Sequence, residues 1–174
     1  MDFKQVDLDV AQEIVRGGEA YLDGQIRLAT SADSRAAGLG GMFTAAATAL
    51  IAGVITLSIR TFPGRFEFMA AGSVTALFFL TGAILCIRSI MPVGFCLSGC
   101  EPEKWFEDVR DGRKLKDCLG DRAMHIQEQI VENAGVLASN ARLFKYGARM
   151  GIAAPFAGLF VWLAIWLSRF GGQF

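Results

Sequence analysis

The chain has 174 residues, of which 53% are hydrophobic, and its 17 lysines and arginines balance its 17 aspartates and glutamates. Its mean hydropathy of +0.40 is too high for an ordinary soluble domain of this length. The zero net charge excludes a broad basic surface for duplex nucleic acid. Because the polar residues fall in two blocks and three segments are almost free of charge, the pattern predicts one integral membrane module with soluble parts.

The first 35 residues mix acidic and apolar side chains at roughly helical spacing, with Val10, Ile14 and Tyr21 among the apolar set. This spacing predicts that segment 1–35 is an amphipathic helix. Its acidic residues repel anionic lipid headgroups, so we expect it to dock on a partner helix rather than on the membrane surface. The same acidic residues interrupt any continuous apolar run, which argues against a secretory signal peptide.

Three charge-free runs, 36–59, 68–87 and 151–168, are long enough to cross a hydrocarbon core of roughly 30 Å at about 1.5 Å per residue. Pro155 lies near the start of the third run, where a missing backbone donor is tolerated. Aromatic residues gather toward its far end, as in an interfacial belt: Trp162, Trp166, Phe170 and Phe174.

Three crossings place segments 1–35 and 88–150 on one side of the membrane, and the turn 60–67 and the tail 169–174 on the other. Most lysines and arginines lie on the first side, which favours that side as cytoplasmic. We therefore expect a protein of the bacterial inner membrane with a cytoplasmic N-terminus and an external C-terminus. The predicted fold class is an all-α integral membrane protein with three transmembrane helices.

The segment 88–150 is broken by glycines and prolines as far as Pro102 and then carries an amphipathic stripe that includes Ile126, Ile130 and Leu137. No strong turn signal precedes the third span, so the stripe predicts a long helix that continues into the membrane. A stripe of this length requires a cover, which either the N-terminal segment or other copies of the chain could supply.

The first span carries small residues four positions apart, the pattern that lets helix backbones approach closely in lipid. This ridge consists of Ala37, Gly41, Ala45, Ala49 and Gly53, and we expect it to pack copies of the chain into a homo-oligomer. Thr44 and Thr48 lie on an adjacent face and are candidates for lining a pore. Such hydroxyls can instead bond to the backbone of their own helix.

Little in the sequence points to transport coupling or catalysis. The three spans contain no charged residue, whereas a coupled transporter or pump needs one. The chain has a single histidine and none of the common nucleophile, phosphate-loop or zinc-protease motifs, so we expect no enzyme and no catalytic residue. The spacing of Cys96, Cys100, Cys118 and His125 matches no common zinc site. We expect neither a metal nor a cofactor.

The residues before and within the first span carry a family resemblance. The relevant run is EAYLDGQIRLATSADSRAAGLGGMFTAAATALIAG at 19–53, followed by a second span and then by PVGF and EPEKW. The chain resembles the small bacterial transmembrane effectors of Pycsar anti-phage defence. In that family a Gln and then Asp-x-(Arg or Lys)-Ala lead into the first membrane helix, which here are Gln25, Asp33, Arg35 and Ala36.

The resemblance implies a protein that disrupts the inner membrane once a cyclic pyrimidine nucleotide signals infection. The cytoplasmic residues that could meet such a nucleotide are Arg110, Arg113, Lys114 and Lys116 for phosphate, with Trp105 to stack on a base. A solvated charge run, with Trp105 at the headgroups, explains the same residues.

Two functions are therefore open. The first is an oligomeric membrane effector that disrupts or permeabilises the inner membrane when triggered from the cytoplasm. The alternative is a non-enzymatic scaffold or accessory subunit that holds a partner protein through its cytoplasmic helices.

Overall fold

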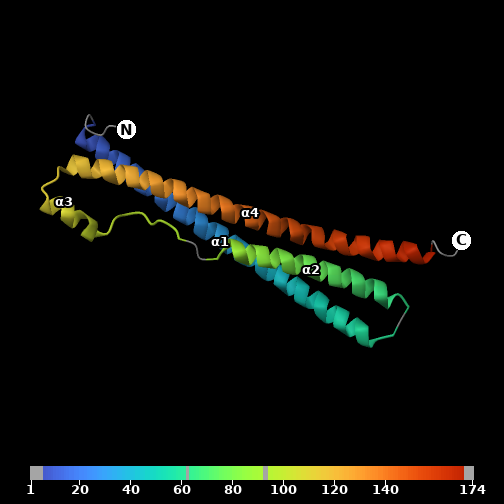
Figure 1. Cartoon of the computed structure of the whole chain (residues 1–174). Coiled ribbons are helices and arrows are strands. Elements are labelled where there is room, and N and C mark those ends of the chain that lie inside the picture. Colours follow the sequence, from blue (N-terminus) through green and yellow to red (C-terminus); the bar gives the residue numbers. More distant parts are fainter. Residues whose placement is uncertain (1–5, 62, 92–93, 171–174) are drawn as a thin grey trace. The chain divides into compact units, whose positions relative to one another are not determined.

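The computed structural model describes residues 6–61, 63–91 and 94–170. Three long helices, α1 (Leu8–Ile59), α2 (Arg65–Ser89) and α4 (Leu115–Phe170), are joined by short connections that include the 3-10 helix η2 (Pro102–Trp105) and helix α3 (Phe106–Arg110) (Figure 1). No strand occurs in the described ranges, so the predicted all-α class is confirmed. Each long helix contains a stretch long and apolar enough to cross a membrane.

The helix ends follow local backbone chemistry. Gly64 adopts a left-handed φ of 83° immediately before α2, and Gly112 adopts a φ of 63° between α3 and α4. Both positions favour glycine because a Cβ would be strained there. Pro102 begins η2, where the missing proline N–H is not needed. Pro155 does not interrupt α4.

Helix α1 crosses the boundary that we placed between segment 1–35 and the first span. It is a single helix from Leu8 to Ile59, and α4 likewise passes through the start of the third span at residue 151. No proline or helix-capping break separates the polar and apolar parts of α1, so hydrogen bonding along the backbone continues. The connection predicted over 60–67 is shorter than expected, since α2 begins at Arg65.

The chain divides into two compact units, each built from segments distant in the sequence. Unit 1 comprises Met1–Ser31 and Pro92–Ala138, and unit 2 comprises Ala32–Met91 and Ser139–Phe174. Helices α1 and α4 contribute residues to both units.

Unit 1 has an apolar core between its parts of α1 and α4. The buried members are Ala11, Val15, Leu22, Leu119 and Ile126. Each fully buried Leu or Ile contributes roughly 1.5–3 kcal/mol relative to an exposed one, so Leu22 and Ile126 are major contributors to this core. The two helices approach closely beside Gly18, where an added Cβ would lie 2.6 Å from Cγ2 of Ile126.

The apolar set that the sequence identifies in segment 1–35 is divided in unit 1, because Leu22 of that set is buried in the core while other members are exposed. Val10, Ile14, Tyr21 and Leu28 are 50%, 37%, 60% and 55% exposed. The buried positions begin one residue further on, with Ala11. Small residues on that face allow α4 to come close, and this close approach leaves the larger side chains on an outer stripe of α1.

Unit 2 packs its helical segments through glycines. A Cβ added to Gly82 on α2 would lie 3.0 Å from the carbonyl oxygen of Gly147 on α4, and one added to Gly147 would lie 2.9 Å from that of Gly82. Gly151 on α4 lies against the ring of Phe43 on α1. Phe43 in turn packs on Phe79, with ring centroids 5.6 Å apart. Close backbone approach of this kind is typical of helices that associate in lipid.

A charged and aromatic cluster joins the start of α2 to the end of α4 in unit 2. Glu67 forms an ion pair with Arg169, and its side chain is only 6% exposed. Nearby, Trp162 stacks on Trp166 with centroids 6.4 Å apart, and the ring of Phe68 lies 6.4 Å from that of Trp162. Two of the predicted belt aromatics are thus together, while the side chain of Phe170 and the tail 171–174 with Phe174 lie outside the description.

Candidate functional site

The predicted packing ridge lies on the outer surface of unit 2. All five of its residues, Ala37, Gly41, Ala45, Ala49 and Gly53, are exposed. A Cβ added to Gly41 or Gly53 would meet nothing within 4 Å. The contacts within unit 2 are made by another face of α1, which includes Gly40, Phe43 and the fully buried Ala47. Within unit 2, and over the residues that the structure describes, the ridge is therefore uncovered.

Thr44 and Thr48 are also exposed, and both hydroxyls donate to their own helix. Thr44 Oγ1 donates to the Gly40 carbonyl at 2.9 Å, and Thr48 Oγ1 donates to the Thr44 carbonyl at 2.9 Å. Because each hydroxyl donor is used within α1, what these threonines offer to water or an ion is their oxygen lone pairs. The candidate pore-lining role then depends on an assembly that turns this face of α1 inward.

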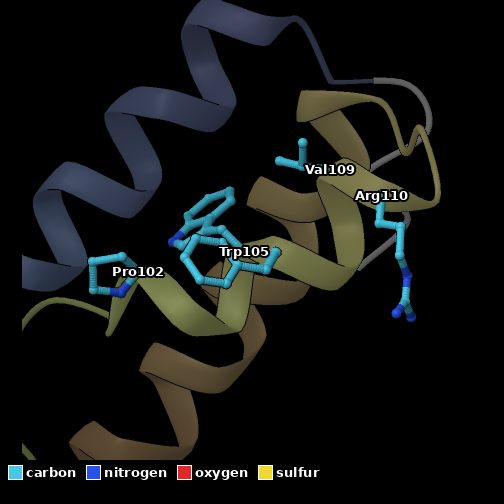
Figure 2. Close-up of a pocket in the computed structure, with 5 residues that line it drawn as sticks. Pro102, Trp105, Val109 and Arg110 are labelled. Atoms are coloured by element: carbon cyan, nitrogen blue, oxygen red, sulfur yellow. The ribbon is translucent and has the colours of Figure 1, made fainter.

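The candidate ligand residues lie in unit 1, around a shallow pocket on η2 and α3. The pocket has a volume of about 580 Å³ and is lined by Pro102, Trp105, Phe106, Val109 and Arg110. Trp105 is half-buried and packs against the unit 1 core. Figure 2 shows the Arg110 side chain extending away from the indole of Trp105. The lining is almost wholly apolar, so it suits a flat or apolar body with an anionic group at the rim.

Arg113 links α3 to the first turns of α4 through ion pairs with Asp108 and Asp121. Its Nη1 donates to Asp108 Oδ1 at 2.7 Å, and its Nη2 donates to Asp121 Oδ2 at 2.6 Å. These hydrogen bonds, first that with Asp121 and then that with Asp108, raise the pKa of the guanidinium above its ordinary value. Two carboxylates thus occupy the guanidinium donors that a phosphate would use.

The remaining predicted cations differ in their surroundings. Arg110 is 75% exposed, and its Nε lies 3.6 Å from Asp111 Oδ1. Lys114 is exposed at the start of α4, where its carbonyl accepts the N–H groups of Asp117 and Cys118. Lys116 is half-buried. Of the predicted ligand set, the structure therefore places Trp105 and Arg110 at one pocket, while the other three cations follow it in the chain.

Sequence reasoning missed several residues of this region. Pro102 and Val109, for which the sequence suggested no ligand role, line the pocket; so does Phe106, which the sequence offers beside Trp105 as a ring that could stack on a base. Pro102 and Val109 lie three and four positions from Trp105, which is the pattern of a single helical face and could have indicated the pocket. Phe106 and Val109 are 65% and 75% exposed, so the pocket wall is itself an exposed apolar patch.

The cysteines of unit 1 take part in separate interactions. Cys96 Sγ donates to Glu132 Oε2 at 3.4 Å. Burial raises the pKa of the Cys96 thiol, and the neighbouring Glu132 carboxylate raises it further. Burial also raises the pKa of Cys118, with a contribution from Asp108. In the part of the chain that the structure describes, no three His, Cys, Asp or Glu side chains gather as metal ligands would.

Comparison of the chain with protein-family models, with curated proteins and with solved structures found no match.

Proposed function

We propose that this chain is a membrane effector that assembles with copies of itself and permeabilises the bacterial inner membrane when triggered from the cytoplasm. The observation that carries the proposal is the uncovered ridge from Ala37 to Gly53. Unit 2 packs its own helices through a different face of α1, so the ridge is not needed to complete the fold of a single chain.

A ridge of Ala and Gly is suited to helix–helix contact in lipid. Lipid tails are as apolar as any side chain, so association there depends on close packing of backbones rather than on the hydrophobic effect. Gly41 and Gly53 have open space beside their Cα atoms, which lets a second helix come close. The neighbouring Thr44 and Thr48 would then lie beside the contact, where their hydroxyl oxygens can face water in an assembled pore.

The trigger in this proposal is a small anionic ligand with a flat ring, taken up at the pocket on η2 and α3. Trp105 supplies a stacking surface, and Arg110 supplies a charge at the rim. The resemblance to Pycsar effectors makes a cyclic pyrimidine nucleotide the first ligand to test. The proposal places the N-terminus and the pocket in the cytoplasm and the C-terminus outside. The reason is that most lysines and arginines lie on the same side of the membrane as the N-terminal segment, and basic residues favour the cytoplasmic side.

The assembly is tested by changing the ridge and measuring oligomer size. Replacing Gly41 or Ala45 by Leu fills the space on the ridge, whereas Ala164→Leu adds the same bulk at an exposed position of α4. We expect the two ridge variants to insert into membranes and to run as monomers in detergent by light scattering, while wild type and Ala164→Leu run as oligomers. Oligomers of unchanged size in both ridge variants would remove the ridge from the proposal.

A scaffold that holds a partner protein is the second candidate, and one observation favours it. The outer stripe of α1 in unit 1 carries Val10, Ile14, Tyr21 and Leu28 at heptad-like spacing, and all four are exposed. Replacing Tyr21 and Leu28 by Ser should release a bound partner if the scaffold reading holds, and should leave membrane permeabilisation unchanged if the effector reading holds.

A further inference from the structure

The segment 94–101, here called the strap, connects the α2 side of the chain to η2 without forming a helix of its own. Within unit 1, α1 and α4 hold the strap chiefly through hydrogen bonds to its backbone. Asn133, which is fully buried on α4, hydrogen-bonds both backbone polar groups of Cys96. Its Oδ1 accepts the Cys96 N–H at 2.8 Å, and its Nδ2 donates to the Cys96 carbonyl at 2.9 Å.

Two further contacts hold the strap two and three residues after Cys96, at Ser98 and Gly99. Arg122 on α4, which is 8% exposed, donates to the Gly99 carbonyl and also pairs with Glu19 on α1 at 3.3 Å. Ser98 donates its hydroxyl to Asp23 on α1. The strap therefore contacts both helices of unit 1 through polar groups of three of its residues, Cys96, Ser98 and Gly99.

The way in which the strap is held makes it easier to release than a packed helix. Leu97, in the middle of the strap, is 69% exposed, and Phe95 is half-buried, so no large apolar side chain of the strap is fully buried. Its ties are hydrogen bonds, which water can replace. Arg122 is also incompletely satisfied, because its Nε has no hydrogen-bond partner within the described ranges.

The strap also occupies a particular place in the chain. It begins five residues after α2 ends at Ser89, and it ends at residue 101, directly before Pro102 of the pocket. Of the described residues between α2 and the pocket, the strap is therefore the segment that leads directly into the pocket. We propose that the strap is a releasable latch, that Asn133 is its main positioning residue, and that release of the strap couples the pocket to α2. The coupling, though not the latch, rests on the proposed function.

Hydrogen exchange of the full-length chain in lipid nanodiscs tests the latch without any ligand. We expect Asn133→Ala to speed exchange of the strap amides, that of Cys96 above all, by roughly tenfold or more, while the unit 1 parts of α1 and α4 keep their protection. Asn140→Ala, the same change seven residues along α4, is the matched control and should leave the strap protected. Faster exchange throughout unit 1 would show that Asn133 only supports the core, and an unchanged strap would show that it is not an anchor; either result overturns the latch.

A second variant avoids the fully buried position. Ser98→Ala removes the tie to Asp23 from a half-buried site on the strap itself, and we expect a smaller increase in exchange confined to the strap. In a liposome release assay, strap release should raise the basal leak or lower the nucleotide concentration needed for half-maximal leak. If wild type leaks on addition of a nucleotide and both variants behave as wild type, the coupling is wrong and the proposed function stands. If wild type never leaks, the proposed function fails and the exchange result alone decides the latch.

Discussion

A pair of glycine-to-alanine changes tests how unit 2 is packed, because the two changes are expected to have opposite signs. Gly147→Ala places a Cβ 2.9 Å from the Gly82 carbonyl oxygen and 2.9 Å from Cys86 Sγ, whereas Gly41→Ala places one in open space. Both gain about 0.5–1 kcal/mol of helix propensity. Only Gly147→Ala adds bulk to a filled contact, which costs about 1–3 kcal/mol. The propensity gain is common to both variants, so the difference between them isolates the packing contribution.

The assay is thermal unfolding of the purified variants in one detergent, followed by circular dichroism. At about 2–4 °C per kcal/mol for a chain of this size, we expect the Tm of Gly147→Ala to lie roughly 2–12 °C below that of Gly41→Ala. Gly41→Ala itself should match or exceed wild type. A Gly147→Ala variant as stable as Gly41→Ala would refute the close approach of α2 and α4 at Gly82.

Three further outcomes follow from named contacts. Glu67→Gln should lower the Tm, since it removes the charge that pairs with Arg169, and exchanging the two residues should restore part of the loss in the same unfolding assay. Cys96 should react with a maleimide at pH 8 more slowly than a free thiol, because its raised pKa leaves less thiolate. Glu132→Gln should speed the reaction, and equal rates for wild type and this variant would contradict the contact between Cys96 and Glu132. Trp105→Ala should weaken nucleotide binding by calorimetry roughly tenfold or more if the indole stacks on the base.

Much of the fold could be predicted because charge-free runs and helical periodicity are local properties. The three spans lie within α1, α2 and α4, and the stripe containing Ile126 and Ile130 identified the side of α4 that meets α1. Local patterns do not choose between two apolar faces of one helix, however. In unit 1, α4 packs on the face of α1 that carries Ala11 and Gly18, because small residues there let the two helices come close.

Contacts between distant segments could not be predicted from one sequence. The pairing of Gly82 with Gly147 and of Glu67 with Arg169 depends on which helices meet, and nothing local to either residue indicates it. Asn133 holds backbone atoms of Cys96, which any residue type would present, so the sequence carries no signature of that tie. At the candidate site, Trp105 and Arg110 were identified by residue type, while the carboxylates that engage Arg113 became visible only in the structure.

The most direct test of the proposed function is dye release from liposomes that contain the purified full-length chain, with a panel of cyclic mono- and dinucleotides supplied on both sides of the membrane. The account predicts release on addition of one of these nucleotides, with a cyclic pyrimidine nucleotide as the first expectation, and no release without it. Intact liposomes with every nucleotide, from protein shown to be inserted and folded, would contradict the account and favour a scaffold that binds a partner protein.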